Sequence, residues 1–136
     1  MDENLHQLLL HRADWFAAEI MRGIRKSPYP QITPSQSRLL AHMAGRPTSM
    51  AELARRLAIS RQAVHKTVNE LARQGILEVH KDPERGNATL VTYTAKGRAI
   101  NRAGAAIIES AEARIAEQIG PDTLERLKNL LRRDWD

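Results

Sequence analysis

The sequence predicts a mainly α-helical protein with one small β-hairpin, and three observations lead to this prediction. Apolar residues recur at helical spacing over most of the 136 residues. A serine or threonine precedes four of the helical stretches, at the positions where such residues cap helices: Thr33, Ser49, Ser60 and Thr94. Residues 77–81 instead alternate in hydropathy, residues 82–87 have the composition of a turn, and residues 90–93 are β-branched and aromatic. We find no repeat and no interdomain linker, so a single domain is expected.

The first two helices are predicted before residue 46. Apolar residues form one stripe from Asn4 to about Ile24. The segment Ser27-Pro28-Tyr29-Pro30 ends this helix, because proline disfavours helix in the residue before it. Thr33-Pro34-Ser35-Gln36 is a capping box that starts the second helix, and Gly45 is the expected left-handed cap at its end.

The middle of the chain predicts two short helices and the hairpin. Ser49-Met50-Ala51-Glu52 is a second capping box, whose helix is expected to end at Ile59. Ser60 caps a helix from Arg61 to about Arg73. Leu77–Lys81 and Leu90–Tyr93 are the predicted strands, joined by the turn residues 82–87.

Two further helices are predicted after the hairpin. A long one begins at Thr94 and continues to Gly120, with an apolar face that runs past Gly104 without interruption. Gly120-Pro121 then separates it from a last, leucine-rich helix that is expected to reach Trp135.

Composition narrows the function. The chain has no cysteine, which excludes thiol redox sensing, zinc–thiolate sites and cysteine nucleophiles. It shows no signal peptide and no apolar run of membrane-spanning length, so a cytoplasmic protein without a membrane partner is expected. A net charge of +5 favours a polyanionic partner, and an aromatic content of 4% favours duplex DNA over a single strand.

Residues 49–94 carry the functional signal, because two helices joined by Ala58-Ile59-Ser60 and followed by a hairpin make a winged helix-turn-helix. In such a motif the second helix enters the major groove. The predicted DNA contacts of this helix are Ser60, Arg61, Gln62, Ala63, His65, Lys66 and Asn69. Arg61 suits guanine, Gln62 or Asn69 suits adenine, and Ser60 with the helix N-terminus suits a phosphate. The alternative is that these residues form the solvated face of an ordinary helix.

Residues 49–97 resemble the core of the multiple-antibiotic-resistance regulator (MarR) family. The resemblance lies in the following segments: Ser49–Ala54, Ser60–Lys66, Leu71, Gly75–Leu77, Asp82-Pro83-Glu84 and Val91–Gly97. It implies a homodimer with intertwined terminal helices, a wing in the minor groove, and release from DNA by a phenolic or other lipophilic ligand. The wing departs from the family pattern, because Gly86 and Asn87 occupy the positions of its two arginines. The predicted wing contacts are Lys81, Arg85 and Asn87.

The resemblance also divides the chain into a core at residues 33–97 and dimerisation helices at residues 1–26 and 98–136. The predicted dimer contacts are Leu5, Leu8, Leu9, Leu124, Leu127, Leu131 and Trp135. Two-fold symmetry predicts a pseudo-palindromic operator. The alternative is that these stripes pack against the long helix within one monomer. The candidate ligand-pocket residues are His11, Trp15, Phe16, Arg38 and His42, although the two aromatics also suit a core or interface role.

These observations favour a sequence-specific transcriptional regulator. The histidine spacing does not suit a metal site, no catalytic constellation is visible, and no cofactor is implied. We therefore expect a homodimeric repressor and not an enzyme. The alternative is a winged-helix protein-interaction module that does not read DNA, for which acidic or apolar residues would be tolerated on the recognition face.

Overall fold

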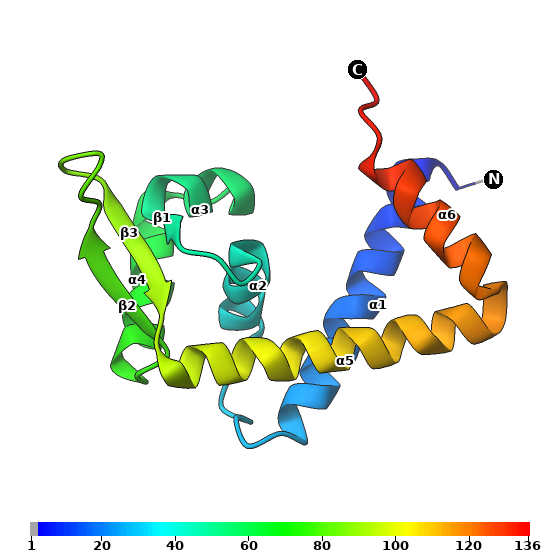
Figure 1. Ribbon diagram of the computed structural model, residues 1–136, viewed down its shortest axis with the longest axis horizontal. Helices are drawn as coiled ribbons and strands as arrows, with labels where there is room; N and C mark the ends of the chain where they lie inside the picture. Colours follow the sequence, from blue (N-terminus) through cyan, green and yellow to red (C-terminus); the bar gives the residue numbers. More distant parts are fainter. Residues whose placement is uncertain (1–2) are drawn as a thin grey trace.

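The computed structural model describes residues 3–136 and confirms the mainly helical fold with a small antiparallel sheet (Figure 1). Its elements, in chain order, are α1 (Leu5–Arg25), α2 (Pro34–Met43), β1 (Thr48–Ser49), α3 (Met50–Leu57), α4 (Arg61–Arg73), β2 (Leu77–Lys81), β3 (Thr89–Tyr93), α5 (Ala95–Ile119) and α6 (Pro121–Arg132). Among the helices of this part of the chain, none has the length and apolar character needed to cross a bilayer.

The long helix α5 connects two parts of the molecule (Figure 1). At its N-terminal end lie α2, α3, α4 and the sheet, and at its C-terminal end lies α6. Helix α1 crosses α5 closely at Gly23, where a β-carbon would come within 2.6 Å of the Ile107 side chain. Glycine is needed here because the two helices approach each other at this point.

The apolar core lies in the part of the molecule that contains the helix-turn-helix. Its largest fully buried side chains are Leu39, Met43, Leu53, Val64, Val68, Leu71, Ile76, Leu77 and Val91. Ile24 of α1 and Ile100 of α5 join this core from outside. In contrast, no residue of α6 is buried. The core therefore fixes α3 and α4 firmly, while the terminal helices expose much of their apolar surface.

The sheet has three strands, because a short strand precedes α3. Thr48 pairs with Val91 and Ser49 with Leu90, which gives the strand order β1-β3-β2. In the hairpin, Leu77 pairs with Tyr93 and Lys81 with Thr89. The sequence predicted the hairpin but not the third strand.

The helix ends show where the expected boundaries were right and where they were wrong. The first capping box is confirmed, since Thr33 Oγ1 accepts from the Gln36 N–H group and Gln36 Oε1 accepts from the Thr33 N–H group. The left-handed cap of α2 is Ala44, at φ 53°, and Gly45 follows it at φ 76°. Helix α3 was expected to end at Ile59, but it ends at Leu57, because Ala58 takes the left-handed conformation.

The second capping box and the last helix also differ from expectation. Ser49 Oγ accepts from the Glu52 N–H group at 3.1 Å, but Glu52 pairs with arginines of its own helix and completes no box. Helix α6 ends at Arg132. Trp135 lies beyond it, with its indole N–H group donating to the Leu130 carbonyl oxygen at 3.1 Å.

Candidate nucleic-acid interface

A sharp turn between α3 and α4 places α4 on the surface. Ala58 adopts a left-handed conformation, and the Ile59 N–H group donates to the Ala54 carbonyl oxygen at 3.2 Å, which closes α3. Ser60 then caps α4, because its Oγ accepts from the Ala63 N–H group at 3.1 Å. The two helices are therefore joined by only three residues, Ala58, Ile59 and Ser60, as a helix-turn-helix requires.

Helix α4 has one buried face and one exposed polar face. Val64, Val68 and Leu71 have no exposed surface. The exposed face carries Arg61, Gln62, His65, Lys66 and Asn69, with Ala63 half-buried at its edge. Within residues 3–136, none of those five polar side chains makes a hydrogen bond or an ion pair. They are therefore free to bind a partner.

The one acidic residue of α4 points away from this face. Glu70 Oε2 accepts from the Gln36 amide at 3.2 Å, and the Gln36 side chain is almost completely buried on α2. This contact holds α4 against α2. It also leaves the exposed face without a negative charge, which favours phosphate groups and base edges as partners.

The wing is a tight turn at the end of the hairpin. The Asp82 N–H group donates to the Ala88 carbonyl oxygen at 2.8 Å, and Asp82 Oδ1 accepts from the Glu84 N–H group at 2.9 Å. Gly86 supplies the positive φ, 61°, that the turn requires. Lys81, Arg85 and Asn87 are all exposed on this wing.

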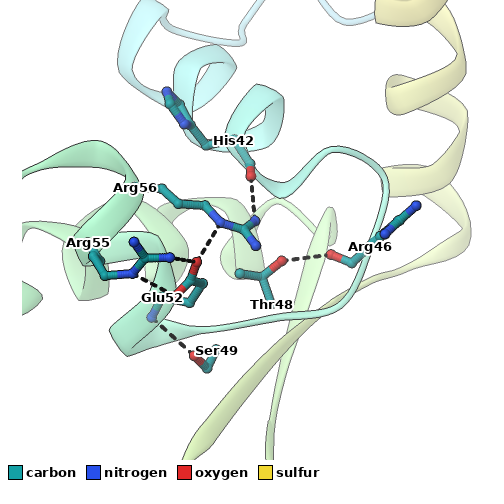
Figure 2. Close-up of polar contacts among 7 residues, drawn as sticks. All are labelled: His42, Arg46, Thr48, Ser49, Glu52, Arg55 and Arg56. Carbon is teal, nitrogen blue, oxygen red and sulfur yellow. Dashed lines mark hydrogen bonds and ion pairs between the residues drawn. The ribbon is translucent and has the colours of Figure 1, made fainter. Parts of the chain in front are cut away.

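Arg56 ties α3 to α2, and Glu52 of α3 pairs with both Arg55 and Arg56 (Figure 2). The sequence analysis did not identify this group. Glu52 accepts from Arg55 Nε at 3.0 Å and from Arg56 Nε at 2.9 Å. Arg56 Nη1 also donates to the His42 carbonyl oxygen at 2.8 Å. The arginines, Arg55 first, lower the pKa of the Glu52 carboxyl group. The pKa of His42 is lowered by loss of water contact and then by the charges of Arg38 and Arg56.

A cavity of about 290 Å³ lies between α1, α2, α5 and the end of β3. Isoleucines from α1 and α5 contribute much of its wall, and Tyr93 closes it on the side of the sheet. The Tyr93 hydroxyl group accepts from the Gly45 N–H group at 3.1 Å and faces the Leu40 carbonyl oxygen at 3.5 Å. Burial raises the pKa of Tyr93.

The five residues named as pocket candidates do not line this cavity. Trp15 and Phe16 pack edge to face, with ring centroids 5.0 Å apart, and the Arg114 guanidinium lies 5.6 Å from the Trp15 ring. His11 is exposed, and its Nδ1 lies 3.0 Å from the carboxylate of Glu3. Arg38 is exposed on α2, and His42 is half-buried where α2 meets α3. The sequence pointed to polar and aromatic residues, whereas the cavity is lined mainly by aliphatic ones.

The terminal helices expose large apolar side chains. Of the predicted dimer contacts, Leu5, Leu8, Leu9, Leu127, Leu131 and Trp135 are exposed and Leu124 is half-buried. The structure adds three exposed residues that the sequence analysis did not name: Leu10, Ile119 and Leu130. We find no cluster of three or more histidine or acidic side chains in residues 3–136 that could hold a metal ion.

Comparison with known proteins finds similarity to one family over part of the chain. The model of the MarR family matches residues 31–86. The uncharacterized protein Rv2011c of Mycobacterium tuberculosis is 28% identical over 101 residues, which are 74% of this chain and 71% of that protein. The HTH-type transcriptional repressor Rv2887 of the same organism is 28% identical over 94 residues, which are 69% of this chain and 66% of the repressor.

Solved structures agree in fold over almost the whole chain. Apo wild-type MarR from E. coli superposes with a TM-score of 0.74 at 18% identity, covering 97% of this chain and 96% of MarR. Streptococcus pneumoniae FabT, solved in complex with DNA, gives a TM-score of 0.74 at 16% identity, covering 93% of this chain and 88% of FabT. The chain is therefore similar to the MarR family over residues 31–86, which include the helix-turn-helix and most of the wing, and it shares the fold of MarR over almost its whole length.

Proposed function

We propose that this protein is a homodimeric repressor that binds a pseudo-palindromic site in duplex DNA and leaves it when a small organic molecule binds. Its similarity to the MarR family and to a transcriptional repressor supports a role as a transcriptional regulator and not as an enzyme. The core at residues 33–97 reads DNA, and the helices at 1–26 and 98–136 form the dimer; residues 1 and 2 lie outside the described residues. Because its target is chromosomal DNA, it acts in the cytoplasm.

The observation that carries this proposal is the exposed face of α4. Arg61, His65 and Lys66 lie there without hydrogen-bond or ion-pair partners among residues 3–136, while Glu70 is held against Gln36 on the other side. A surface of this kind suits the negative charge and the base edges of the major groove. FabT, which has the same fold, has been solved in complex with DNA, and this supports DNA as the partner.

The exposed leucines support the dimer. Leu5 is 56% exposed and Leu131 is 45% exposed, and both belong to apolar stripes that no other part of the described chain covers. Contiguous apolar surface of this kind usually meets a partner, and a second copy of the chain is the occupant that two-fold operator symmetry requires. The dimer then carries two α4 helices about 34 Å apart, one turn of DNA.

The cavity supports control by a ligand. Its walls come from α1 and α5 on one side and from α2 and Tyr93 on the other. It therefore lies between the proposed dimerisation helices and the proposed DNA-reading core. A molecule bound there would contact both parts, and could favour an arrangement in which the two α4 helices no longer fit neighbouring major grooves.

The test is selection of binding sites from a pool of random duplexes, followed by fluorescence anisotropy at several salt concentrations. We expect enrichment of a two-fold symmetric motif and an affinity that falls steeply with salt, since each phosphate contact releases counterions. If the protein enriches no motif and binds weakly at low salt, the proposal is wrong. A winged-helix module for protein interaction would then be the better assignment.

A further inference from the structure

We propose that Gln36 of α2 is a positioning residue for DNA binding, because it holds the Glu70 carboxylate away from Lys66 and so keeps Lys66 available to a phosphate group. This inference rests on the proposed function, since it concerns the DNA-reading face of α4. It is drawn from three features: the buried amide of Gln36, the place of Glu70 on α4, and the exposed ammonium group of Lys66.

The Gln36 side chain is fixed by hydrogen bonds from both atoms of its amide. Only 3% of this residue is exposed. Its Oε1 accepts from the Thr33 N–H group at 3.0 Å, within the capping box of α2. This bond sets the direction of the amide, so that its NH2 group faces α4 and donates to Glu70 Oε2 at 3.2 Å. The Glu70 carboxylate is therefore held between α2 and α4 by a charge-assisted hydrogen bond.

The backbone of Glu70 lies beside the recognition face, although its carboxylate points away from that face. Residues four apart on a helix are neighbours on its surface, so Glu70 lies one turn after Lys66. Helical side chains also lean toward the N-terminus of their helix, which is the direction from Glu70 to Lys66. A Glu70 carboxylate released from Gln36 would therefore reach the Lys66 ammonium group.

Lys66 is the cation that a released Glu70 would bind. It is exposed and makes no ion pair within residues 3–136. Arg73, three residues after Glu70, already donates from Nε to the Asn69 carbonyl oxygen at 3.3 Å. An ion pair between Lys66 and Glu70 would cancel a positive charge on the proposed DNA surface and remove a phosphate contact.

The hydrogen bond between Gln36 and Glu70 also joins α2 to α4, so a purely structural role for Gln36 has to be distinguished. A structural link is lost whenever the hydrogen bond is lost, whatever the charge of residue 70. Positioning of a carboxylate matters only while residue 70 carries a negative charge. Removing that charge in a variant that already lacks Gln36 therefore separates the two roles.

The experiment compares Gln36→Met, Glu70→Gln and the double variant by fluorescence anisotropy with the selected operator at several salt concentrations. Gln36→Met should weaken operator binding at least about threefold and reduce the dependence of log affinity on log salt concentration by about one, as expected for one lost phosphate contact. Glu70→Gln and the double variant should bind at least as tightly as the wild type, with its salt dependence. A double variant as weak as Gln36→Met overturns the proposal.

The matched control is Gln31→Met, which makes the same change at an exposed position shortly before α2. It should leave operator binding unchanged. Gln36→Glu is a second variant, because its carboxylate can still accept from the Thr33 N–H group but repels Glu70. It should weaken operator binding as Gln36→Met does, and unchanged binding would overturn the proposal. Circular dichroism checks that every variant is folded.

Reaction of the free protein with acetic anhydride tests the same inference without DNA. Mass spectrometry measures the acetylation of Lys66 relative to that of Lys26, which is exposed at the end of α1. A paired ammonium group holds its proton more firmly and reacts less, so the relative acetylation of Lys66 should fall at least about twofold in Gln36→Met. It should recover in the double variant.

The two measurements separate this inference from the proposed function. If Lys66 acetylation changes as expected while the wild-type protein enriches no operator, then the assignment of Gln36 holds and the repressor assignment is wrong. If the wild-type protein binds its operator, but Gln36→Met changes neither the salt dependence nor the acetylation of Lys66, then the repressor assignment stands and Gln36 is not a positioning residue.

Discussion

Gly97 and Gly104 lie on the same helix, yet a methyl group would meet opposite surroundings at the two positions. At Gly97 a β-carbon would lie 2.1 Å from the Ile76 carbonyl oxygen, which is backbone and cannot rotate away. We expect Gly97→Ala to lower the free energy of unfolding by about 1–3 kcal/mol, the usual cost of overpacking. Gly104→Ala should raise it by about 0.5–1 kcal/mol, because alanine favours helix. Urea denaturation measures both, and a Gly97→Ala variant as stable as the wild type would contradict the close approach.

Arg61 is the first residue of α4, and no other residue of the described part of the chain binds its side chain and holds it away from DNA. We expect Arg61→Ala to weaken binding to the selected operator by about 1–3 kcal/mol and to relax the preference at one base position. Fluorescence anisotropy with the operator and with single-base variants measures both effects. The matched control is Arg126→Ala on α6, which removes the same charge far from α4 (Figure 1). Equal losses in the two variants would mean that only net charge matters.

At the scale of elements, the turn of the wing at residues 82–87 carries a single arginine, Arg85. Arg85 is exposed at the turn, beside the acidic Glu84. We expect Arg85→Ala to weaken binding similarly for all sequences and to reduce the dependence of log affinity on log salt concentration by about one. Anisotropy titrations at several salt concentrations, with operator and with random duplex, measure this. A loss confined to A·T-rich sequences would instead mean that Arg85 reads the width of the minor groove.

The packing of α2 on α3 makes stability depend on pH near neutrality. The pKa of His42 is lowered below its ordinary value of 6.5, first by loss of water contact and then by Arg38 and Arg56. The unfolded chain therefore takes up a proton at His42 at a higher pH than the folded protein does. Consequently the free energy of unfolding falls as pH drops below 6.5 toward the folded pKa, and it is unaffected by His42 well above 6.5.

We expect His42→Gln to remove this component, so that its stability changes less than that of the wild type between about pH 7 and pH 5. Urea denaturation over that range measures the difference. The pKa values of Glu19 and Glu52 are also lowered, but from 4.5, so their effects begin at lower pH. Parallel curves for variant and wild type would show that His42 does not contribute.

The elements that could be predicted from sequence are those with a local cause. Thr33 and Gln36 form their capping box from residues three positions apart, and the strand Leu77–Lys81 has its predicted bounds. The short strand β1 could not be predicted, because two residues are too few for a pattern and their pairing partner lies on β3. Ser49 and Glu52 have the spacing of a capping box, as Thr33 and Gln36 do. However, Arg55 and Arg56 at the next turn of the helix attract the Glu52 carboxylate more strongly than the backbone of Ser49 does.

The recognition face of α4 was predictable for the same reason, since its residues are neighbours on one helix. The cavity was not. Its wall joins α1, α2, β3 and α5, and the residues that create it are aliphatic or small, which is also the signature of a packed core. Only the empty space in front of Gly104 distinguishes the wall of a cavity from a packed core, and that space depends on how the helices cross.

At the scale of the whole molecule, the distribution of buried residues distinguishes the packed core from the exposed terminal helix α6. The fully buried side chains belong to the core around α3 and α4, while α6 has none. Leu127, Leu130 and Leu131 of this helix are 44–46% exposed. Covering them with a partner would remove apolar surface from water, which is favourable. The terminal helices are therefore the surface on which the proposed dimer depends, and operator binding depends on the dimer in turn.

We expect the double variant Leu127→Glu/Leu131→Glu to be a folded monomer, because the dimer would bury two unpaired charges per chain. Size-exclusion chromatography with light scattering measures the mass, and circular dichroism measures the helix content. The control is Val79→Glu, which changes an aliphatic residue of similar exposure on β2 and should leave the mass of a dimer. The monomer should keep weak, salt-sensitive binding to a single half-site and lose the strong preference for two-fold symmetric operators, since it presents one α4 helix instead of two. A double variant that retains the mass of a dimer, or a wild-type protein that is monomeric while bound to its operator, would show that α6 does not form the interface.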